Sequence, residues 1–156
     1  MSRQRLLTIS TLAAAAAFAA GAAEAGQCPA GQSAVDARQA GAKAHSKVTD
    51  KVIGSIDLAH EAPALKSHKF RLRRLVVQPG GEVAWHSHAD RPAIIYIVSG
   101  TILEYSSTCR VPIVHRAGDV ATETHVTSHW WKNRSSKPAV LLSADILHDT
   151  SDPHTM

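Results

Sequence analysis

A His-x-His pair, His86 and His88, is the part of the sequence with the clearest capacity for chemistry. In an extended segment, side chains two positions apart lie on one face, so both imidazoles point the same way. Neutral imidazole is a good transition-metal ligand, and two rings on one strand face can share an ion. A bare pair of this kind is more often two surface histidines. The surroundings favour the metal, because Pro79-Gly80-Gly81 precedes the pair and an apolar run, Ala93 to Val98, follows it.

The elements that must position this pair are short β-strands, which the sequence predicts from residue 51 onward. The expected strands are Val52–Leu58, Lys69–Gln78, Glu82–His88, Ala93–Val98, Thr101–Ser106, Val111–Arg116, Val120–Glu123, Ser128–Lys132 and Ala139–Ile146. Many short strands, frequent turn residues and no long amphipathic helix predict an all-β sandwich or barrel.

Local signals predict where these strands are interrupted. The apolar alternation slips at Arg73 and Arg74, which predicts a β-bulge there. Pro79–Gly81 and Ala117–Asp119 predict turns, and Ser99-Gly100 predicts a tight hairpin connection.

Two histidines alone hold an ion weakly, so we expect a further ligand from elsewhere in the chain. The best candidates are His125 and His129, four positions apart between Gly118 and Asn133. On a continuous strand both side chains would share a face, but a turn between them favours a cavity wall or surface position for His125.

These residues resemble the two motifs of the cupin family, Gly-x5-His-x-His-x3,4-Glu-x6-Gly and Gly-x5-Pro-x4-His-x3-Asn. The matching positions are Gly80, His86, His88, Gly100, Gly118, His129 and Asn133. The resemblance covers about residues 68–147. It implies a double-stranded β-helix, or jelly-roll, barrel that holds a metal inside, here with an N-terminal arm.

Two positions depart from the motifs, with Ala93 in place of the glutamate and Thr124 in place of the proline. The resemblance therefore implies one divalent metal on His86, His88 and His129, with Fe(II) favoured and Mn, Zn, Cu or Ni open. Three neutral imidazoles leave about three positions of an octahedral shell open. Because some cupin dioxygenases resemble this pattern, the resemblance implies a metal-dependent small-molecule enzyme whose catalytic residues are not assigned. The alternative is a module that binds a small ligand or metal without turnover.

Several polar residues are candidates for supporting the ligands. Asn133, Glu104 and Glu123 are candidate hydrogen-bond partners that fix the ligand imidazoles. Whether Glu104, Glu123 or His125 replaces the glutamate missing at Ala93 stays open at this stage.

Other residues are assigned to the cavity by strand parity. Ile95 and Ile97 are expected to face inward and Tyr96 outward. Trp131 shares the parity of His129 and is either a cavity wall or plain core. Arg91 either binds a substrate carboxylate or, as we favour here, is a solvated loop residue.

The first 25 residues predict a secretory signal. Residues 1–5 are basic, residues 6–20 are apolar and alanine-rich, and Ala23-Glu24-Ala25 is a cleavage site. We expect a Sec-type signal cut after Ala25, a location in the periplasm or outside the cell, and no membrane insertion after cleavage.

The rest of the chain divides into an arm, a barrel and a tail. Residues 26–50 are expected to be an extended or loosely ordered arm, with a short helix conceivable at 35–44. Residues 51–148 are the barrel and 149–156 the C-terminal tail. An even cysteine count in an oxidising compartment predicts one disulfide, Cys28–Cys109. Two free thiols, or Cys109 as a metal ligand, are the alternatives.

The charge pattern bears on partners. With 17 Lys and Arg against 13 Asp and Glu, the net charge is only +4. The densest basic stretch, Lys66 to Arg74, is best explained as a solvated strand face. Nucleic acid is not expected, because export removes it and no aromatic residues are interleaved for stacking. The expected partner is a small-molecule substrate or ligand, and the resemblance implies a homodimer as the default assembly.

Overall fold

The protein is described from a computed structural model that covers residues 26–37 and 41–148. The predicted signal at 1–25 and the predicted tail at 149–156 lie outside the described residues. The elements are β1 Ser46–Asp57, a 3-10 helix Pro63–Leu65, β2 His68–Ser87, β3 Ala93–Ser99, β4 Thr101–Ser106, β5 Ile113–Arg116, β6 Val120–Glu123, β7 Ser128–Lys132 and β8 Ala139–His148. The all-β prediction is confirmed. Within this part of the chain, no helix has the length and apolarity needed to span a bilayer.

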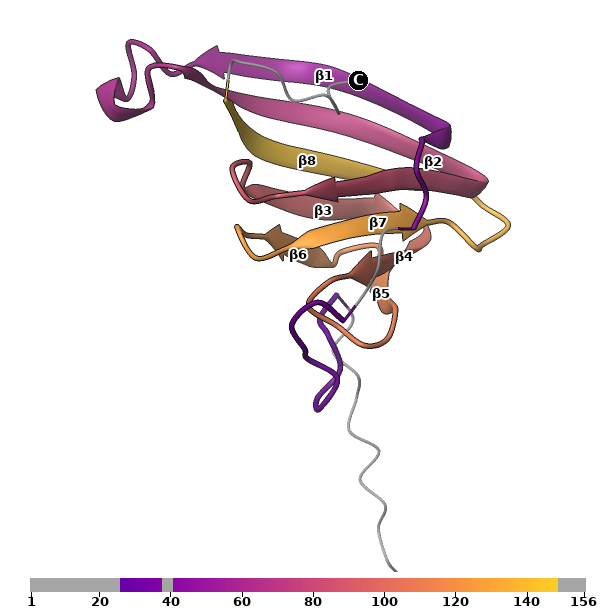
Figure 1. Ribbon diagram of the computed structural model, residues 1–156. Coiled ribbons are helices and arrows are strands. Elements are labelled where there is room, and N and C mark those ends of the chain that lie inside the picture. The colour runs from indigo at the N-terminus through magenta and orange to yellow at the C-terminus, as the bar shows by residue number, and fades with distance from the viewer. Residues whose placement is uncertain (1–25, 38–40, 149–156) are drawn as a thin grey trace, which may run out of the picture.

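The strands form a nearly closed antiparallel barrel (Figure 1). They hydrogen-bond in the order β5-β4-β7-β2-β8-β3-β6, and β1 pairs with β2 outside this path. The long strand β2 joins the two halves, because residues 68–77 pair with β8 whereas residues 82–87 pair with β7. Residues of the middle of the chain are thereby brought against β7, some forty residues later.

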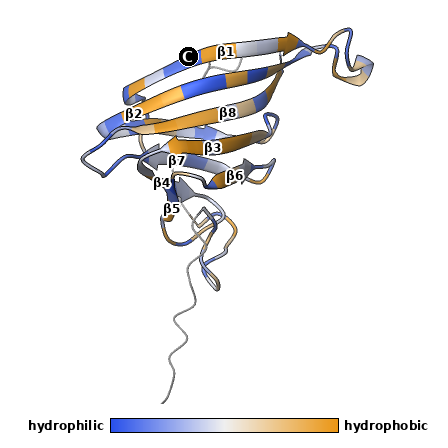
Figure 2. Cartoon of the chain, turned by 180° about the vertical axis from the view of Figure 1, so that it is seen from behind, coloured by the Kyte–Doolittle hydropathy of each residue, from blue (hydrophilic) through white to orange (hydrophobic). Residues whose placement is uncertain are grey.

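The predicted bulge at Arg73 and Arg74 is wrong. β2 pairs with β8 in unbroken register from His68 to Val77, and the register shift lies instead on β1, between Val52 and Gly54. The buried residues of this part of β2 therefore alternate without a slip, at Arg71, Arg73, Leu75 and Val77. Figure 2 shows that β2 carries both hydrophilic and hydrophobic residues along its length. Arg71 and Arg73 are consequently buried, while Phe70 and Leu72 are partly exposed on the outer face. The interpretation of Lys66–Arg74 as a solvated face is thus wrong for these two arginines.

Two predicted connections also differ in the structure. β2 runs through Pro79–Gly81 as one strand, which here changes partner from β8 to β7 rather than ending. Ser99-Gly100 does not close a hairpin, because β3 pairs with β6 and β8 whereas β4 pairs with β5 and β7. Gly100 has a φ of 84°, and a Cβ there would lie 2.5 Å from the Pro138 oxygen. Only glycine fits this close crossing between the two halves.

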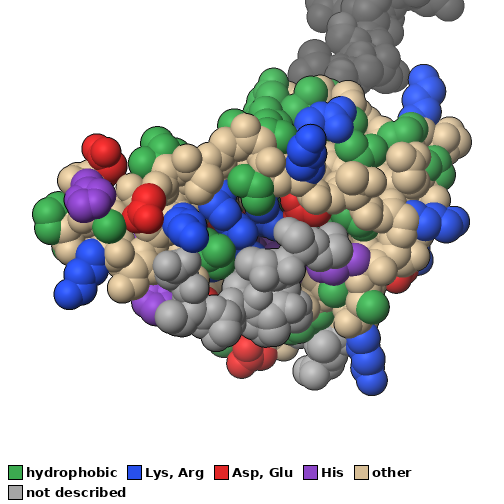
Figure 3. All heavy atoms as spheres, turned by 90° about the horizontal axis from the view of Figure 1, so that it is seen from above, with side chains coloured by type: hydrophobic (Ala, Val, Ile, Leu, Met, Phe, Trp, Pro, Cys, Tyr) green, Lys and Arg blue, Asp and Glu red, His purple; other side chains and the backbone are tan. Residues whose placement is uncertain are grey.

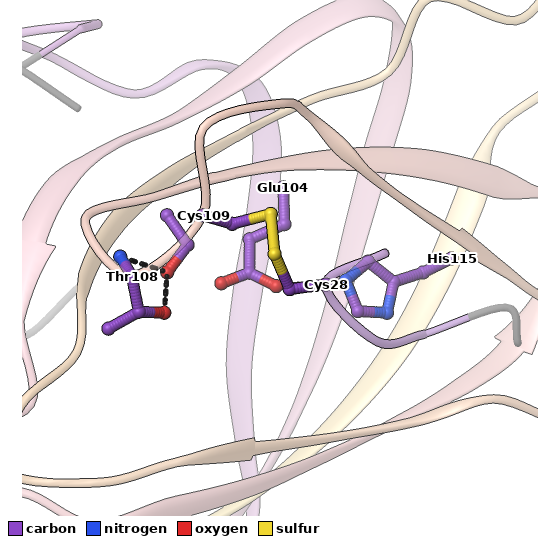
Figure 4. Close-up of a disulfide and its surroundings, with 6 residues drawn as sticks. Cys28, Glu104, Thr108, Cys109 and His115 are labelled. Atoms are coloured by element: carbon purple, nitrogen blue, oxygen red, sulfur yellow. Dashed lines mark hydrogen bonds and ion pairs between the residues drawn. A yellow bond between two sulfur atoms is a disulfide. The ribbon is translucent and has the colours of Figure 1, made fainter. Parts of the chain in front are cut away.

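The arm is more ordered than expected. β1 begins at Ser46, before the predicted start at Val52, and the described residues of 35–44 form no helix. Cys28 and Cys109 form a disulfide (Figure 4), and Ser33 makes an isolated β-bridge with Cys109. The arm is therefore fixed against the loop that joins β4 to β5.

The core lies inside the barrel. Its buried apolar residues are Leu75, Val77, Val83, Ile95, Ile97, Ile102, Ala121, Trp131, Ala139 and Leu141. Ile95 and Ile97 face inward as expected, and Tyr96 is 43% exposed. The same interior also holds charged and polar side chains, and these define the site described next.

Candidate metal centre

Three histidines converge inside the barrel from two adjacent strands. His86 lies near the end of β2, His88 directly follows that strand, and His129 lies in β7. The antiparallel register places His86 opposite His129, and the amide of His88 donates to the Thr127 carbonyl at 2.9 Å. This pairing of β2 with β7 brings His86 and His88 to the same point as His129.

The spacing of the ring nitrogens fits one shared ion. His129 Nε2 lies 3.1 Å from His88 Nε2 and 3.1 Å from His86 Nε2. At metal–nitrogen bonds of about 2.1 Å, ligand atoms at right angles are about 3.0 Å apart and tetrahedral ones about 3.4 Å apart. His86, His88 and His129 can therefore hold a metal ion.

The second nitrogen of each ring fixes its tautomer. The Nδ1–H groups of His86 and His88 donate to the carbonyls of Ala84 at 2.8 Å and Arg91 at 2.7 Å. His129 Nδ1–H donates to Glu104 Oε1 at 2.8 Å. With every Nδ1 proton committed, three Nε2 lone pairs face one another, an arrangement that a cation stabilises. The donor set thus fits a divalent metal.

Burial keeps two of the rings neutral. It lowers the pKa of His86 far below the ordinary value, and burial together with the nearby His129 lowers the pKa of His88 to about 3. Burial also acts to lower the pKa of His129, but the charges of Glu123 and Glu104 outweigh it and raise that pKa. A proton on His129 therefore competes with a metal for the site.

Two acidic residues lie behind His129, on the side away from the three lone pairs. Glu104 accepts from His129 Nδ1 and, through Oε2, from His115 Nε2 at 2.9 Å. Burial acts to raise the pKa of Glu104, but these two hydrogen bonds outweigh it and lower the pKa to about 2. Glu123 Oε2 lies 3.4 Å from His129 Nδ1, and burial raises the pKa of Glu123 to about 7. Glu104 thus has the ligand-orienting position expected of it.

This arrangement bears on the ligand missing at Ala93. Glu104 and Glu123 approach the Nδ1 side of His129, so neither takes the missing ligand's place beside the Nε2 atoms. The same two carboxylates and His129 form a second group close enough to hold an ion. His129 Nδ1 is protonated and donates a hydrogen bond to Glu104, so it has no lone pair for an ion on that side. The two carboxylates are therefore better described as groups that hold the His129 ring in place. His125 is exposed in the turn before β7, away from the cluster.

Two further candidates have roles of a different kind. Asn133 is fully buried, but its Nδ2 donates to the carbonyls of Val77 and Lys137, each at 2.8 Å, and its Oδ1 accepts from Ser135. It therefore fixes the β7–β8 loop against β2 and does not orient a histidine. Trp131 is buried in the core and also lines the cavity beside the histidines, and its indole Nε1–H donates to His129 Nε2 at 3.3 Å.

A buried group of charges beside the histidines was not expected from the sequence. Arg71 donates twice to Asp145, at 3.0 and 2.8 Å, and Arg73 pairs with Asp50 at 2.6 Å. Arg91 is only 4% exposed, against the expectation of a solvated loop arginine. The signal that could have revealed the first two arginines is their strict alternation with Leu75 and Val77.

The disulfide closes the polar side of the barrel, behind the candidate metal site. Cys28, Glu104 and Glu123 line one cavity there, together with Ser106 and Thr127. Figure 4 shows the Glu104 and His115 side chains in the surroundings of the Cys28–Cys109 bridge. The arm thus covers the residues that support His129.

Comparison with known proteins agrees with this architecture. Residues 73–145 match the family model described as the cupin domain. A comparison with curated proteins finds no match. A structure described as a predicted oxalate decarboxylase from Thermotoga maritima is 20% identical, with a TM-score of 0.55 over 70% of this chain and 90% of that one. An uncharacterised double-stranded β-helix protein from Klebsiella pneumoniae is 16% identical, with a TM-score of 0.54 over 68% and 82%.

The Cnp3 cupin domain of Schizosaccharomyces pombe is also similar, at 12% identity and a TM-score of 0.51 over 69% of this chain and 67% of that one. At such identities the likeness establishes the fold and not the activity. The chain is a cupin-domain protein with a double-stranded β-helix barrel.

Proposed function

We propose that this protein is an exported, metal-dependent enzyme acting on a small molecule, with one divalent ion held by His86, His88 and His129. The observation that carries the proposal is the convergence of three Nε2 atoms, 3.1 Å apart in two of the pairs, with every Nδ1 already committed to an acceptor. Histidines without a metal role have no physical reason to share one tautomer and to direct their Nε2 atoms at one point.

We favour Fe(II) as the ion. Mn, Zn, Cu or Ni are alternatives, because imidazole is a good ligand for several of these metals. When bound, the ion supplies a Lewis acid that orients a small oxygen-rich or phenolic substrate, with dioxygen as the proposed second reactant. The three neutral rings leave its charge uncompensated and about three positions open, which supports chemistry of the dioxygenase kind.

The protein's own groups prepare this site. The carbonyls of Ala84 and Arg91 and the carboxylate of Glu104 hold the three rings in place. The anionic Glu104 also makes His129 more electron-donating than a neutral acceptor would. Buried Trp131 stands beside His129 and limits access of water to the ring.

Metal analysis tests the first part of the proposal. The mature protein is expected to carry about one ion per chain, which a His86→Gln/His129→Gln double variant loses. His125→Gln is the matched control, because His125 is an exposed histidine in the turn before β7, the strand that carries His129. Equal metal content in all three proteins, with intact folds by circular dichroism, excludes the site.

Oxygen consumption tests the second part. The fully loaded protein is incubated with catechols, β-diketones and thiols while dissolved oxygen is recorded. Turnover that disappears in the double variant supports the enzyme. Failure with every candidate at full metal loading favours a non-catalytic module that binds a ligand or metal.

Export is tested separately. Expression of the full chain in a bacterium should give a periplasmic protein whose intact mass begins at Gly26. A cytoplasmic product that keeps residues 1–25 contradicts this part of the proposal.

A further inference from the structure

A polar cavity lies behind His129, on the side of its Nδ1 atom and beneath the arm. The residues that line it are Gly26, Gln27, Cys28, Glu104, Ser106, Thr108, Ile113, Ala121, Thr122, Glu123 and Thr127. The cavity measures about 120 Å³ as the space open to the centre of a water molecule. Since one water needs about 10–15 Å³ of such space, the cavity has room for an ion together with several waters.

The charged side chains of this cavity are all acidic. It is lined by Glu104 and Glu123, and among the described residues no Lys or Arg lines it. The cavity beside the three Nε2 atoms is different, because Arg73 and Arg91 line it. Figure 3 shows Lys and Arg side chains recessed in the middle of the face seen from above. A cation is therefore suited to the cavity behind His129, where buried carboxylates are costly without a positive partner.

Glu123 has an oxygen without a partner. The residue is only 3% exposed, and its Oε1 accepts no hydrogen bond within the described residues. Its other oxygen, Oε2, lies 3.4 Å from His129 Nδ1, which gives its hydrogen to Glu104 at 2.8 Å. Buried polar atoms are normally satisfied, so an unpartnered carboxylate oxygen on the wall of this cavity indicates a ligand that it binds there.

The other possible ligands in the cavity are also oxygens. Glu104 accepts one hydrogen bond on each oxygen, from His129 and His115, and a carboxylate has about four lone-pair sites, so both oxygens can still bind a cation. Ser106 Oγ and Thr108 Oγ1 lie 2.8 Å apart and share one hydrogen bond. His129 is not a ligand on this side, because its Nδ1 is protonated. The cavity therefore offers oxygen ligands and no nitrogen or sulfur ligand.

We propose that this cavity binds a hard divalent cation such as Ca²⁺, through the carboxylates of Glu123 and Glu104 and the hydroxyls of Ser106, Thr108 and Thr127. Oxygen ligands suit hard cations, whereas imidazoles suit transition metals. Ca²⁺ accepts six to eight oxygens in flexible geometry, so an irregular set completed by waters fits it better than Mg²⁺, which demands an octahedron. The inference goes beyond the proposed function, because the two sites use different residues as ligands and favour different ions.

Isothermal titration calorimetry with Ca²⁺ tests the inference on the mature protein. One equivalent of Zn(II) is added first, so that the imidazole site is occupied by an ion that it prefers to Ca²⁺. We expect one Ca²⁺ per chain with a dissociation constant of about 10⁻⁴–10⁻³ M, the range of extracellular calcium-binding modules.

Two variants alter different ligands of the cavity. Glu123→Gln keeps the size of the side chain and removes its charge, so Ca²⁺ affinity is expected to fall at least about tenfold. Ser106→Ala/Thr108→Val removes two hydroxyls and leaves both carboxylates, with an expected loss of about threefold or more. This second variant keeps the test decisive if Glu123→Gln does not fold.

Glu82→Gln is the matched control for the removal of a glutamate charge. Glu82 is partly exposed, pairs with Lys132 and does not line the cavity. Its replacement should leave Ca²⁺ affinity within about twofold of wild type, since exposed pairs contribute little.

The outcomes separate this inference from the proposed function. Absence of Ca²⁺ binding in the millimolar range means that water alone fills the cavity, and overturns the inference. Equal Ca²⁺ affinity in the unaltered protein and in the folded cavity variants places the ion elsewhere and overturns it as well. Failure of the unaltered protein to hold its zinc overturns the proposed function alone, because the cavity variants still report on Ca²⁺.

Discussion

The Glu104→Gln substitution tests whether the residues behind His129 tune the metal centre. Glu104 is 4% exposed and accepts from two imidazoles, His129 at 2.8 Å and His115 at 2.9 Å. Glutamine has nearly the same shape and still offers one oxygen to His129. It removes the negative charge, and its amide hydrogens then face His115.

The size of the effect follows from these contacts. A hydrogen bond to a charged group contributes about 1.5–3 kcal/mol, and a neutral one about 0.5–1.5 kcal/mol. The change therefore weakens the hold on His129 by about 1 to 1.5 kcal/mol, which corresponds to about tenfold in metal affinity. This value lies at the lower end of the roughly 10- to 100-fold losses found when the hydrogen-bond partner of a metal ligand is replaced.

Competition with a chromophoric chelator measures the affinity of wild type and variant for Zn(II) at pH 7. Glu82→Gln is the matched control. Glu82 is a partly exposed glutamate that pairs with Lys132 across β2 and β7, the strands that position His86 and His129. The control should bind within about twofold of wild type, as exposed pairs contribute little. A correctly folded Glu104→Gln protein with wild-type affinity would refute the claim that the negative charge of Glu104 tunes the candidate metal centre.

Three further predictions concern stability. The pKa of Glu123 is raised to about 7 from an ordinary value of 4.5, so its neutral form is favoured in the folded protein. Metal-free wild type should therefore lose stability as the pH rises from about 4.5 through 7, by on the order of 3 kcal/mol relative to Glu123→Gln. Urea unfolding at several pH values measures this difference. Replacing Cys28 and Cys109 by serine opens a loop with a separation of 81 residues and should cost about 4 kcal/mol in the same assay. Arg71→Met leaves Asp145 without its bidentate partner and should cost about 3–5 kcal/mol.

Each of these has a result that contradicts it. Parallel pH profiles for wild type and Glu123→Gln would mean that this carboxyl titrates normally. An unchanged urea midpoint in the serine variant, or in wild type after reduction, would show that the disulfide adds nothing to stability. A cost below about 1 kcal/mol for Arg71→Met would show that Asp145 finds another partner or is solvated.

The strand plan could be predicted from the sequence because turn residues and alternation are local signals. Four expected strands agree with β3, β4, β6 and β7 to within one residue at either end. The errors arose where a non-local feature decides. The alternation of Arg71 and Arg73 with Leu75 was taken for a slip, since arginines are rarely buried without partners. Those partners lie on β1 and β8, and only the pairing of these strands with β2 shows them.

The supporting residues show a similar division. The sequence analysis named Glu104, Glu123 and Asn133 together as candidate partners of the ligand imidazoles, but their contacts separate them. The carboxylates face His129, whereas Asn133 spends its amide on two carbonyls of the neighbouring loop and strand. His115 had no spacing signal, because its role depends on β4 and β5 lying side by side.

The sequence alone determined the class of fold and the three candidate ligands, because strand periodicity, turn chemistry and motif spacing are written in neighbouring residues. The tertiary structure alone decided which charges lie inside the barrel and which carboxylate holds His129. Those properties depend on pairs such as Arg71–Asp145, 74 positions apart, and are set only when distant strands take one register. Burial then makes each such pair costly to break, and so gives the site its chemistry.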